Sequence, residues 1–288
     1  MAKTPTWHVR LRTISHRITW VLGTRFPEAI PLVFVVGYPK SGTTWVCQLA
    51  ADLLELPFPR YSLLPIGCPA VVHGHEVVRK GYPKCIYSVR DGRDVMASLY
   101  FFLSRHLPDG PLSGLSPRDR RLFPGMKDKN DTKRNFLPFL EGQLKSPHAS
   151  PMPWGAHVRS FFEARNPNTV MIRYEDLLSD GVATLVREVG VIAGRPIDEG
   201  RARASMEKYS FARQAGRKKG AEDRSSFLRK GQAGDWMNHF TPEAAAFFDR
   251  HFGEELVRTG YENDRGWVER FAKRCAAGAG ASEGAPTA

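Results

Sequence analysis

A loop bracketed by two glycines carries the residue types best suited to binding an anion. Gly37 and Gly42 enclose a short turn that contains Lys40. The residues before it, 33–36, are apolar and mostly β-branched, which predicts a buried strand. The apolar periodicity after it predicts a helix that ends near residue 55. A glycine-rich turn from a strand into a helix directs free N–H groups and the helix dipole at one point, so we expect an anionic ligand there.

The loop differs from the Walker A motif at an informative position. That motif places Lys directly after the second Gly, followed by a hydroxyl for magnesium. Here Thr43 takes the position of that lysine, and Lys40 lies inside the turn instead. A lysine inside the turn still puts a positive charge beside a transferred group or its leaving oxygen. The alternative interpretation is an ordinary strand-to-helix turn capped by threonines.

A second candidate anion contact follows the apolar run at residues 84–89, which predicts another strand. Arg90 stands at the end of that strand and can make a bidentate contact to phosphate. Ser98 follows on a helix predicted from residue 93 to 103. The alternative is a surface arginine and a serine in a helix interior.

A third cluster lies in the polar loop at residues 227–236. Arg229 and Lys230 are followed directly by Gly231. Two cations beside a glycine suit a loop that wraps around a phosphate. An exposed basic turn is the alternative interpretation.

The three segments described above, taken in their order along the chain, resemble those of sulfotransferases of the cytosolic type. These enzymes use 3′-phosphoadenosine 5′-phosphosulfate (PAPS). P-K-S-G-T-T-W at 39–45 resembles the family's 5′-phosphosulfate loop, and R-K-G-x-x-G-D-W at 229–236 resembles its signature for the 3′-phosphate. The matches run from residue 33 to 241. The resemblance implies these cofactor-binding residues: Lys40, Ser41, Gly42, Thr43, Thr44, Trp45, Arg90, Ser98, Tyr174, Phe211, Arg229, Lys230 and Gly231.

Three aromatic residues of that set match the family's contacts to adenine. Trp45 aligns with the stacking Trp, Tyr174 with the Y-E-D after the third strand, and Phe211 with an [ST]-x-F segment. Each of the three could instead belong to the hydrophobic core.

The resemblance also implies a histidine base. The family carries K-T-H before the second strand, and His73-Gly74-His75 stands there, which puts His75 at the catalytic position. Lys40 is the second catalytic residue that the resemblance implies. Histidine suits this role because its ordinary pKa lies near neutrality. His73, where the family often has Lys, is the alternative base, and either residue could be purely structural. Glu76 is a candidate to orient the base.

The implied reaction is in-line transfer of a sulfuryl group from PAPS to a hydroxyl or amine of a small molecule, with no metal. Phe101, Phe102 and His73 are the candidate acceptor pocket, which favours an apolar or aromatic alcohol or an amphiphile. Two alternatives are a P-loop kinase-like phosphotransferase and a non-catalytic protein that binds PAPS or its product PAP. The kinase would need magnesium and a lysine after Gly42.

Composition and periodicity indicate one α/β domain with a parallel sheet covered on both faces, and the resemblance implies that this three-layer fold is P-loop-like. The chain has 288 residues, 42% hydrophobic and 25% charged, with a net charge of +12. Basic charge favours acidic ligands, but no aromatic or zinc-finger pattern supports nucleic-acid binding. A third strand is predicted at 169–173, and alternating strands and helices imply a parallel sheet. Further helices are predicted at about 156–164, 182–193, 199–207 and 242–258.

The domain boundaries follow from composition. Residues 1–30 form a basic amphipathic segment, which either packs on its own domain or lies on a membrane surface. The sulfotransferase domain is expected at 31–274, with an irregular insertion or lid at 104–153, and 275–288 are expected to be a disordered tail.

Cysteine usage and one missing motif bear on the protein's surroundings. The four cysteines form no C-x-x-C pair and indicate reduced thiols, and no signal peptide is recognised, so a cytoplasmic location is expected. The family's dimer motif would fall at residues 237–246, where only Thr241 is kept. The family's dimer motif is therefore not matched, and the oligomeric state is left open.

Overall fold

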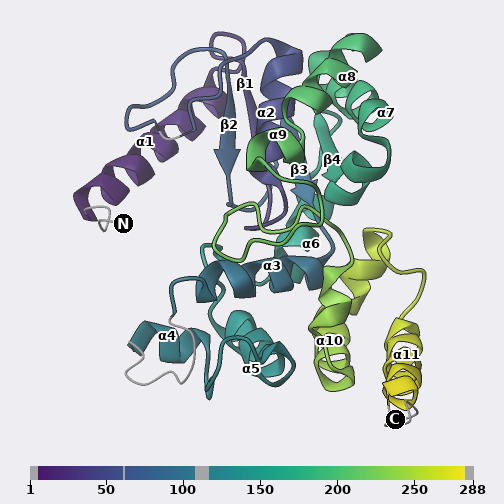
Figure 1. The fold of residues 1–288 in the computed structure, drawn as a ribbon. Coiled ribbons are helices and arrows are strands. Elements are labelled where there is room, and N and C mark those ends of the chain that lie inside the picture. The colour runs from purple at the N-terminus through teal and green to yellow at the C-terminus, as the bar shows by residue number, and fades with distance from the viewer. Residues whose placement is uncertain (1–5, 61, 108–116, 283–288) are drawn as a thin grey trace. The chain divides into compact units, whose positions relative to one another are not determined.

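The computed structural model describes residues 6–60, 62–107 and 117–282, and the chain divides into two compact units (Figure 1). Unit 1 contains the described residues of 1–90 and 160–218, and unit 2 those of 91–159 and 219–288. The single domain expected over 31–274 therefore consists of two units, each built from two separate stretches of chain.

Unit 1 is built around a four-stranded parallel sheet in the order β2-β1-β3-β4. The predicted strands at 33–36, 84–89 and 169–173 are confirmed, and β2 is an additional strand that the sequence did not indicate. The elements are α1 (Thr6–Arg25), β1 (Leu32–Val36), α2 (Thr43–Leu54), β2 (Ala70–Gly74), β3 (Cys85–Val89), β4 (Thr169–Arg173), α7 (Tyr174–Ala193), α8 (Glu199–Lys208) and α9 (Phe211–Ala215).

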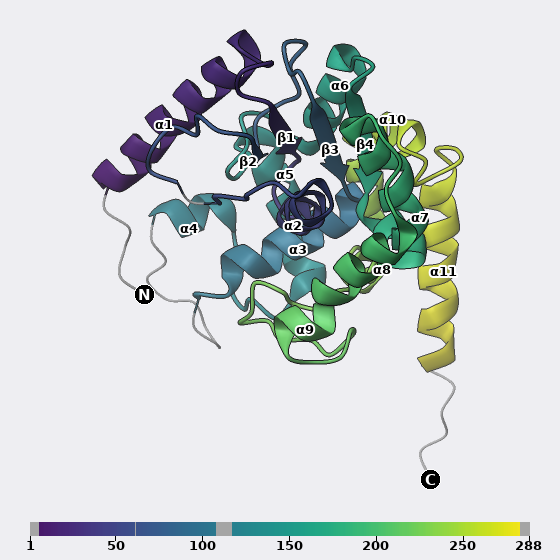
Figure 2. The same cartoon turned by 90° about the horizontal axis from the view of Figure 1, so that it is seen from above.

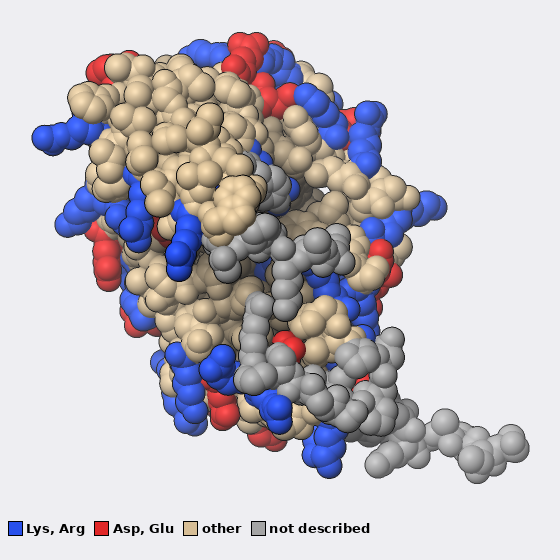
Figure 3. Space-filling view, turned by 90° about the vertical axis from the view of Figure 1, so that its left-hand side faces the viewer, with Lys and Arg blue, Asp and Glu red and all other residues tan. Residues whose placement is uncertain are grey.

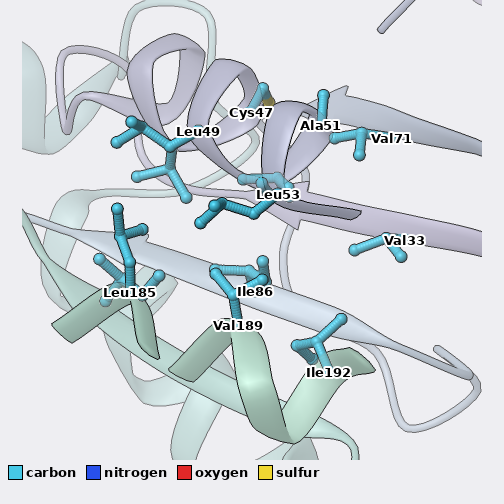
Figure 4. Close-up of a cluster of buried hydrophobic side chains, with 14 of the residues drawn as sticks. Val33, Cys47, Leu49, Ala51, Leu53, Val71, Ile86, Leu185, Val189 and Ile192 are labelled. Carbon is cyan, nitrogen blue, oxygen red and sulfur yellow. The ribbon is translucent and has the colours of Figure 1, made fainter. Parts of the chain in front are cut away.

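One face of this sheet is covered by α2, α7 and α8. Val33 and Val35 of β1 and Ile86 of β3 point toward these helices, because alternate strand residues share a face. Leu49 and Leu53 of α2 pack with them. In the close-up, residues of α2 lie at one end of the cluster and residues of α7 at the other, with Ile86 of β3 between them (Figure 4).

The other face is covered by α1 and by the end of α6 (Trp154–Ala164). Phe34 packs on Tyr82, and Trp20 of α1 meets the same tyrosine ring. Tyr87 of β3 stacks on Phe161 with ring centroids 5.0 Å apart. Seen from above, α2 and α1 lie on opposite sides of the sheet (Figure 2). Unit 1 thus has the predicted three layers.

Unit 2 is helical and has an aromatic core. Its elements are α3 (Gly92–Ser104), α4 (Pro117–Leu122), α5 (Thr132–Lys145), the start of α6, the short 3-10 helix η1 (Asp235–Asn238), α10 (Pro242–Arg258) and α11 (Trp267–Ser282). Tyr100 of α3 lies within 6 Å, ring to ring, of Phe123, Phe136 and Phe139. The predicted helices at 93–103 and 242–258 are confirmed.

Two expectations for irregular structure were wrong. The segment 104–153 contains α4 and α5, and α5 buries Phe136, Phe139 and Leu140 at helical spacing although Pro138 lies inside it. Residues 108–116 of that segment lie outside the described part. The tail expected from residue 275 instead continues α11 to Ser282, because its alanines permit a helix; residues 283–288 lie outside the described part.

The other predicted helices agree with the structure, with one extension. Those at 156–164 and 199–207 correspond to α6 and α8. The helix predicted at 182–193 begins earlier, at Tyr174, and is bent where Asp180 leaves helical geometry with φ −143°. The early start places Tyr174 directly at the end of β4.

Candidate functional site

The loop between β1 and α2 takes a conformation that its two glycines permit. Gly42 has φ +82°, a region that disfavours residues with a Cβ, and Lys40 also has positive φ, at +73°. A Cβ on Gly37 would lie 2.4 Å from the carbonyl oxygen of Ser88. In addition, the Ser88 hydroxyl donates to the carbonyl of Ser41 at 2.9 Å. The loop is therefore held tightly against β3.

The start of α2 offers two buried hydroxyl groups that no group in the described part of the chain binds. Helices leave their first N–H groups without intrahelical acceptors, and α2 begins at Thr43. Ser41 and Thr43 are 1% and 3% exposed. Among the described residues, neither of their hydroxyl groups has a hydrogen-bond partner. Buried hydroxyls without partners beside a helix N-terminus fit a phosphate group, which accepts several hydrogen bonds.

Tyr174 brings three predicted cofactor residues of unit 1 together. A Cβ on Gly42 would lie 2.8 Å from its ring, so the ring packs directly on the loop backbone. The Arg90 guanidinium lies 4.5 Å above the same ring. Trp45 meets it edge-on with centroids 5.7 Å apart. The aromatic pair and the arginine thus border the same end of the loop.

The loop also holds His75. Gly37 N–H donates to the carbonyl of Gly74 at 3.3 Å, which ties the loop to the end of β2. His75 Nδ1 lies 2.8 Å from the carbonyl oxygen of Gly37. A carbonyl can only accept, so Nδ1 carries the hydrogen, and in the neutral ring Nε2 is left as the proton acceptor.

Burial keeps both histidines of the H-G-H segment neutral. It lowers the pKa of His75 below the ordinary 6.5; the Gly37 hydrogen bond opposes that shift and the Lys40 charge adds to it. Burial, with the His75 ring and Arg60, lowers the pKa of His73 to about 3. The two rings meet edge-on at 4.6 Å.

The sequence makes Glu76 a candidate to orient the base, but its hydrogen bonds are made to other residues. Its carboxylate lies 3.1 Å from His16 Nε2 on α1 and accepts from the Tyr82 hydroxyl at 3.0 Å. Burial raises the pKa of Glu76, but the bond and charge of His16 outweigh this and hold it at about 2. The Glu76 bond raises the pKa of His16 in turn. This pair ties α1 to the segment that carries His75.

A cavity of about 830 Å³ opens beside the two histidines within unit 1. Its walls come from α1, from the end of β2 and from four residues between α2 and β2: Pro59, Arg60, Ser62 and Ile66. Four arginines and one glutamate are among its lining residues: Arg12, Arg17, Arg60, Arg79 and Glu76. Trp20, Ile66 and Val72 supply apolar surface. Neither the cavity nor the part played by α1 was apparent from the sequence.

In unit 2, the predicted phosphate-binding cations are aligned by carboxylates. Asp235 accepts from Lys230 Nζ at 2.6 Å and also pairs with Arg229. Glu222 forms a second ion pair with Arg229. Burial opposes the charge of Asp235, but hydrogen bonds from His239, Lys230 and Arg229 outweigh it and hold its pKa below the usual range.

The backbone of this loop is fixed from α3. Asp94 accepts from the N–H groups of Gly234 at 2.6 Å and Trp236 at 2.9 Å, while Asp91 caps the helix. Gly231 has φ +66°, which favours glycine. The sequence pattern named the cations, but it did not show that Asp235 pairs with them or that Asp94 holds the backbone of their loop.

The remaining predicted site residues are placed as follows. Ser98 is half-buried on α3. Phe101 is buried beneath the Arg229 guanidinium at 4.4 Å, and Phe102 meets Phe227 edge-on. Phe211 begins α9 under Arg217, and none of the described ring contacts joins it to Trp45 or Tyr174. Of the predicted acceptor pocket, His73 alone lines the cavity beside His75.

A family model described as "Sulfotransferase domain" matches residues 72–260, well over half of the chain. Among curated relatives, an amine sulfotransferase of Oryctolagus cuniculus is 25% identical over 267 residues, covering 78% of this chain and 80% of that protein. Sulfotransferase 2B1 of Mus musculus is 24% identical over 288 residues, covering 83% of this chain and 78% of that one.

Solved structures share the fold at lower sequence identity. Mouse sulfotransferase SULT7A1 complexed with PAP matches with a TM-score of 0.59 and 22% identity, covering 83% of this chain and 89% of that one. Retinol dehydratase in complex with androsterone and the inactive cofactor PAP matches with a TM-score of 0.53 and 19% identity, covering 84% and 85%. The predicted P-loop-like α/β fold is confirmed.

Proposed function

The chain belongs to the sulfotransferase family, and from that premise we propose that it transfers a sulfuryl group from PAPS to a hydroxyl or amine of a small molecule. The observation that carries this proposal is the bond between His75 Nδ1 and the Gly37 carbonyl. It joins a neutral base, with Nε2 as acceptor, to the backbone of an anion-binding loop. A proton acceptor thus lies next to a site for a negatively charged donor.

His75 and Lys40 divide the chemistry in this proposal. His75 Nε2 accepts the proton of the acceptor hydroxyl as its oxygen forms a bond to sulfur. The bond from sulfur to the 5′-phosphate oxygen breaks, and its electron pair stays on that oxygen, which leaves with PAP. Lys40 stabilises the negative charge that develops there. The rest of the contribution is positioning, which spares the reactants much of the entropy cost of meeting.

The donor supplies the activated sulfuryl group, and the chain offers residues for each part of it. Ser41 to Thr44, where the loop enters α2, would hold the 5′-phosphate, consistent with the hydroxyls of Ser41 and Thr43 that are buried there without partners. The 3′-phosphate is assigned to these residues: Arg90, Ser98, Arg229, Lys230 and Gly231. Trp45, Tyr174 and Phe211 are assigned to adenine. The proposal includes no metal.

The acceptor is assigned to the cavity beside His75. Its apolar walls suit the body of an alcohol, and its surplus of arginines over glutamate favours an acceptor that also carries an acidic group. We therefore assign an amphiphilic alcohol to this cavity, with His73 as one of its walls. The four cysteines, all within the described residues, form no disulfide, and a cytoplasmic location is part of the proposal.

The test is a transfer assay with sulfur-labelled PAPS and pairs of hydrophobic alcohols that differ only in an acidic group. We expect labelled product and equimolar PAP, with the acidic member of each pair preferred. PAP binding without transfer to any acceptor would favour the non-catalytic alternative. Transfer of phosphate from ATP, dependent on magnesium, would favour the kinase.

A further inference from the structure

The helix α1 exposes its large apolar residues and buries small and polar ones. Trp7, Leu11, Ile14, Ile18 and Val21 are 39% to 61% exposed. Their spacing of four, three, four and three residues puts them on one line of the helix. Phe26, just past its end, is 54% exposed. This line of side chains is called the α1 ridge below.

The inner face of α1 is fixed by specific contacts, so the helix cannot turn to bury the ridge. Thr19 is 1% exposed, and its hydroxyl accepts from the N–H of Ile66 at 2.8 Å. A Cβ on Gly23 would lie 2.5 Å from Leu32, so the backbone packs directly on β1. His16 is bonded to Glu76. These contacts hold the ridge outward.

The helix also carries positive charge without any negative charge. It contains four arginines, Arg10, Arg12, Arg17 and Arg25, and no Asp or Glu. Arg10 and Arg17 each have ridge residues three positions before and four after them, and both are exposed. They therefore flank the ridge along one side. On the face shown in Figure 3, blue side chains lie beside a largely tan upper area.

From this ridge and its flanking arginines we propose that α1 docks the protein on an anionic lipid surface. Apolar side chains on one line suit insertion at the boundary of headgroups and acyl chains, and arginines beside them suit anionic headgroups. No helix in the described part of the chain is long and apolar enough to cross a membrane. In the proposed pose α1 lies along the surface.

Charge decides whether the ridge contacts a lipid bilayer or the α1 helix of a second copy of the protein. The ridge spacing would also suit a seam between two copies of α1. Such a seam would bring Arg10 and Arg17 of both copies together with no acidic residue on either helix to offset them. Anionic lipid supplies the missing negative charge, so the bilayer is favoured.

The cavity beside His75 is lined in part by the same helix that is proposed to contact the lipid. Arg12, His16 and Trp20 of α1 line the cavity that also contains His75. The helix therefore exposes its ridge, while residues of its other side, together with Arg17 and Val21, form a wall of the proposed acceptor cavity. An amphiphilic acceptor could pass from the lipid surface to the cavity around α1. Docking itself does not depend on the proposed reaction.

Flotation of the full chain with lipid vesicles tests the proposal without any activity measurement. We expect binding to phosphatidylcholine vesicles containing phosphatidylglycerol, little binding to phosphatidylcholine alone, and loss of binding at high salt. Ile14→Gln with Ile18→Gln should reduce binding at least tenfold. Arg10→Gln with Arg17→Gln should reduce it roughly fivefold per arginine at low salt.

The matched control replaces an exposed apolar residue on another helix. Val191 of α7 is 50% exposed, and Val191→Gln should leave vesicle binding unchanged. Absence of binding to the anionic vesicles, or equal binding by the Ile14/Ile18 variant, would overturn the proposal. So would a dimer in analytical ultracentrifugation that this variant converts to monomer, since the ridge would then belong to a second copy.

Discussion

His75 and Gly37 are joined by a hydrogen bond of 2.8 Å from an imidazole nitrogen to a backbone carbonyl. Gly37 opens the anion-binding loop, and His75 follows directly after β2. The bond sets which ring nitrogen carries the hydrogen and leaves Nε2 as the acceptor. It also fixes the distance between the base and the loop, because both atoms belong to short, well-packed segments.

Replacing His75 should abolish turnover and spare donor binding. His75→Asn can still donate to the Gly37 carbonyl but offers no basic nitrogen, so we expect kcat to fall by about 10²–10⁴-fold. Affinity for PAP, measured by calorimetry, should change less than twofold. His73→Asn should mainly raise KM for the acceptor, since a group with a pKa of about 3 is a poor base. A His75→Asn enzyme with near-normal kcat would refute the assignment.

The pH profile should report the lowered pKa of His75. The base works only when neutral, so kcat/KM should be flat above pH 6.5 and fall only below that value as the ring protonates. The nearby charge of Lys40 contributes to the shift. In Lys40→Met the pKa of His75, followed by NMR, should therefore rise. A pKa that is unchanged or lower in this variant would contradict the account.

Gly42→Ala should damage both stability and donor binding. The substitution forces a Cβ into positive φ, which costs about 1–2 kcal/mol, and drives it into the Tyr174 ring. Gly194 is the matched control: its φ is +67° and nothing lies within 4 Å of the added Cβ. Gly194→Ala should lower the free energy of unfolding while PAP affinity stays normal. Equal PAP affinity in both variants would show that the Gly42–Tyr174 contact does not shape the site.

The His16–Glu76 pair should make the stability contributed by α1 depend on pH. The pKa of His16 is raised, so its contribution is complete below 6.5 and is lost as pH rises through the folded value. The pKa of Glu76 is about 2, so its contribution is complete above 4.5 and is lost as pH falls toward 2. The pair is thus strongest between these limits.

Urea unfolding of His16→Ala measures this dependence. The variant should lose more unfolding free energy at about pH 5.5 than at about pH 8.5. In a Glu76→Gln background that difference should disappear. The same difference in both backgrounds would show that the bond to Glu76 is not its cause.

Local sequence patterns predicted much of the candidate site. Gly42 is recognisable because its positive φ favours glycine, and Gly37 because its backbone lies too close to Ser88 for a Cβ. Arg90 is recognisable because it directly follows a buried strand. The family pattern also indicated Tyr174, but its packing on Gly42 joins β4 to the loop over more than a hundred residues. Such contacts depend on the order of strands in the sheet, which spacing alone does not determine.

The features missed from the sequence are those set by distant partners. Asp235 reads as part of a signature, and only the folded loop shows that it pairs with Arg229 and Lys230. Glu76 was a candidate to orient the histidine beside it, whereas it forms a hydrogen bond with His16, sixty residues away. Helix α5 was hidden by Pro138, which usually ends a helix but is accommodated here.

The most direct test of the central claim is the heat of binding of PAP, AMP and ATP, each with and without magnesium. The account predicts tight binding of PAP that does not need the metal, and weak binding of AMP and ATP. In Lys230→Gln the preference for PAP over AMP should shrink at least tenfold, because only PAP carries a 3′-phosphate. A preference for ATP with magnesium, or equal binding of PAP and AMP, would contradict the account.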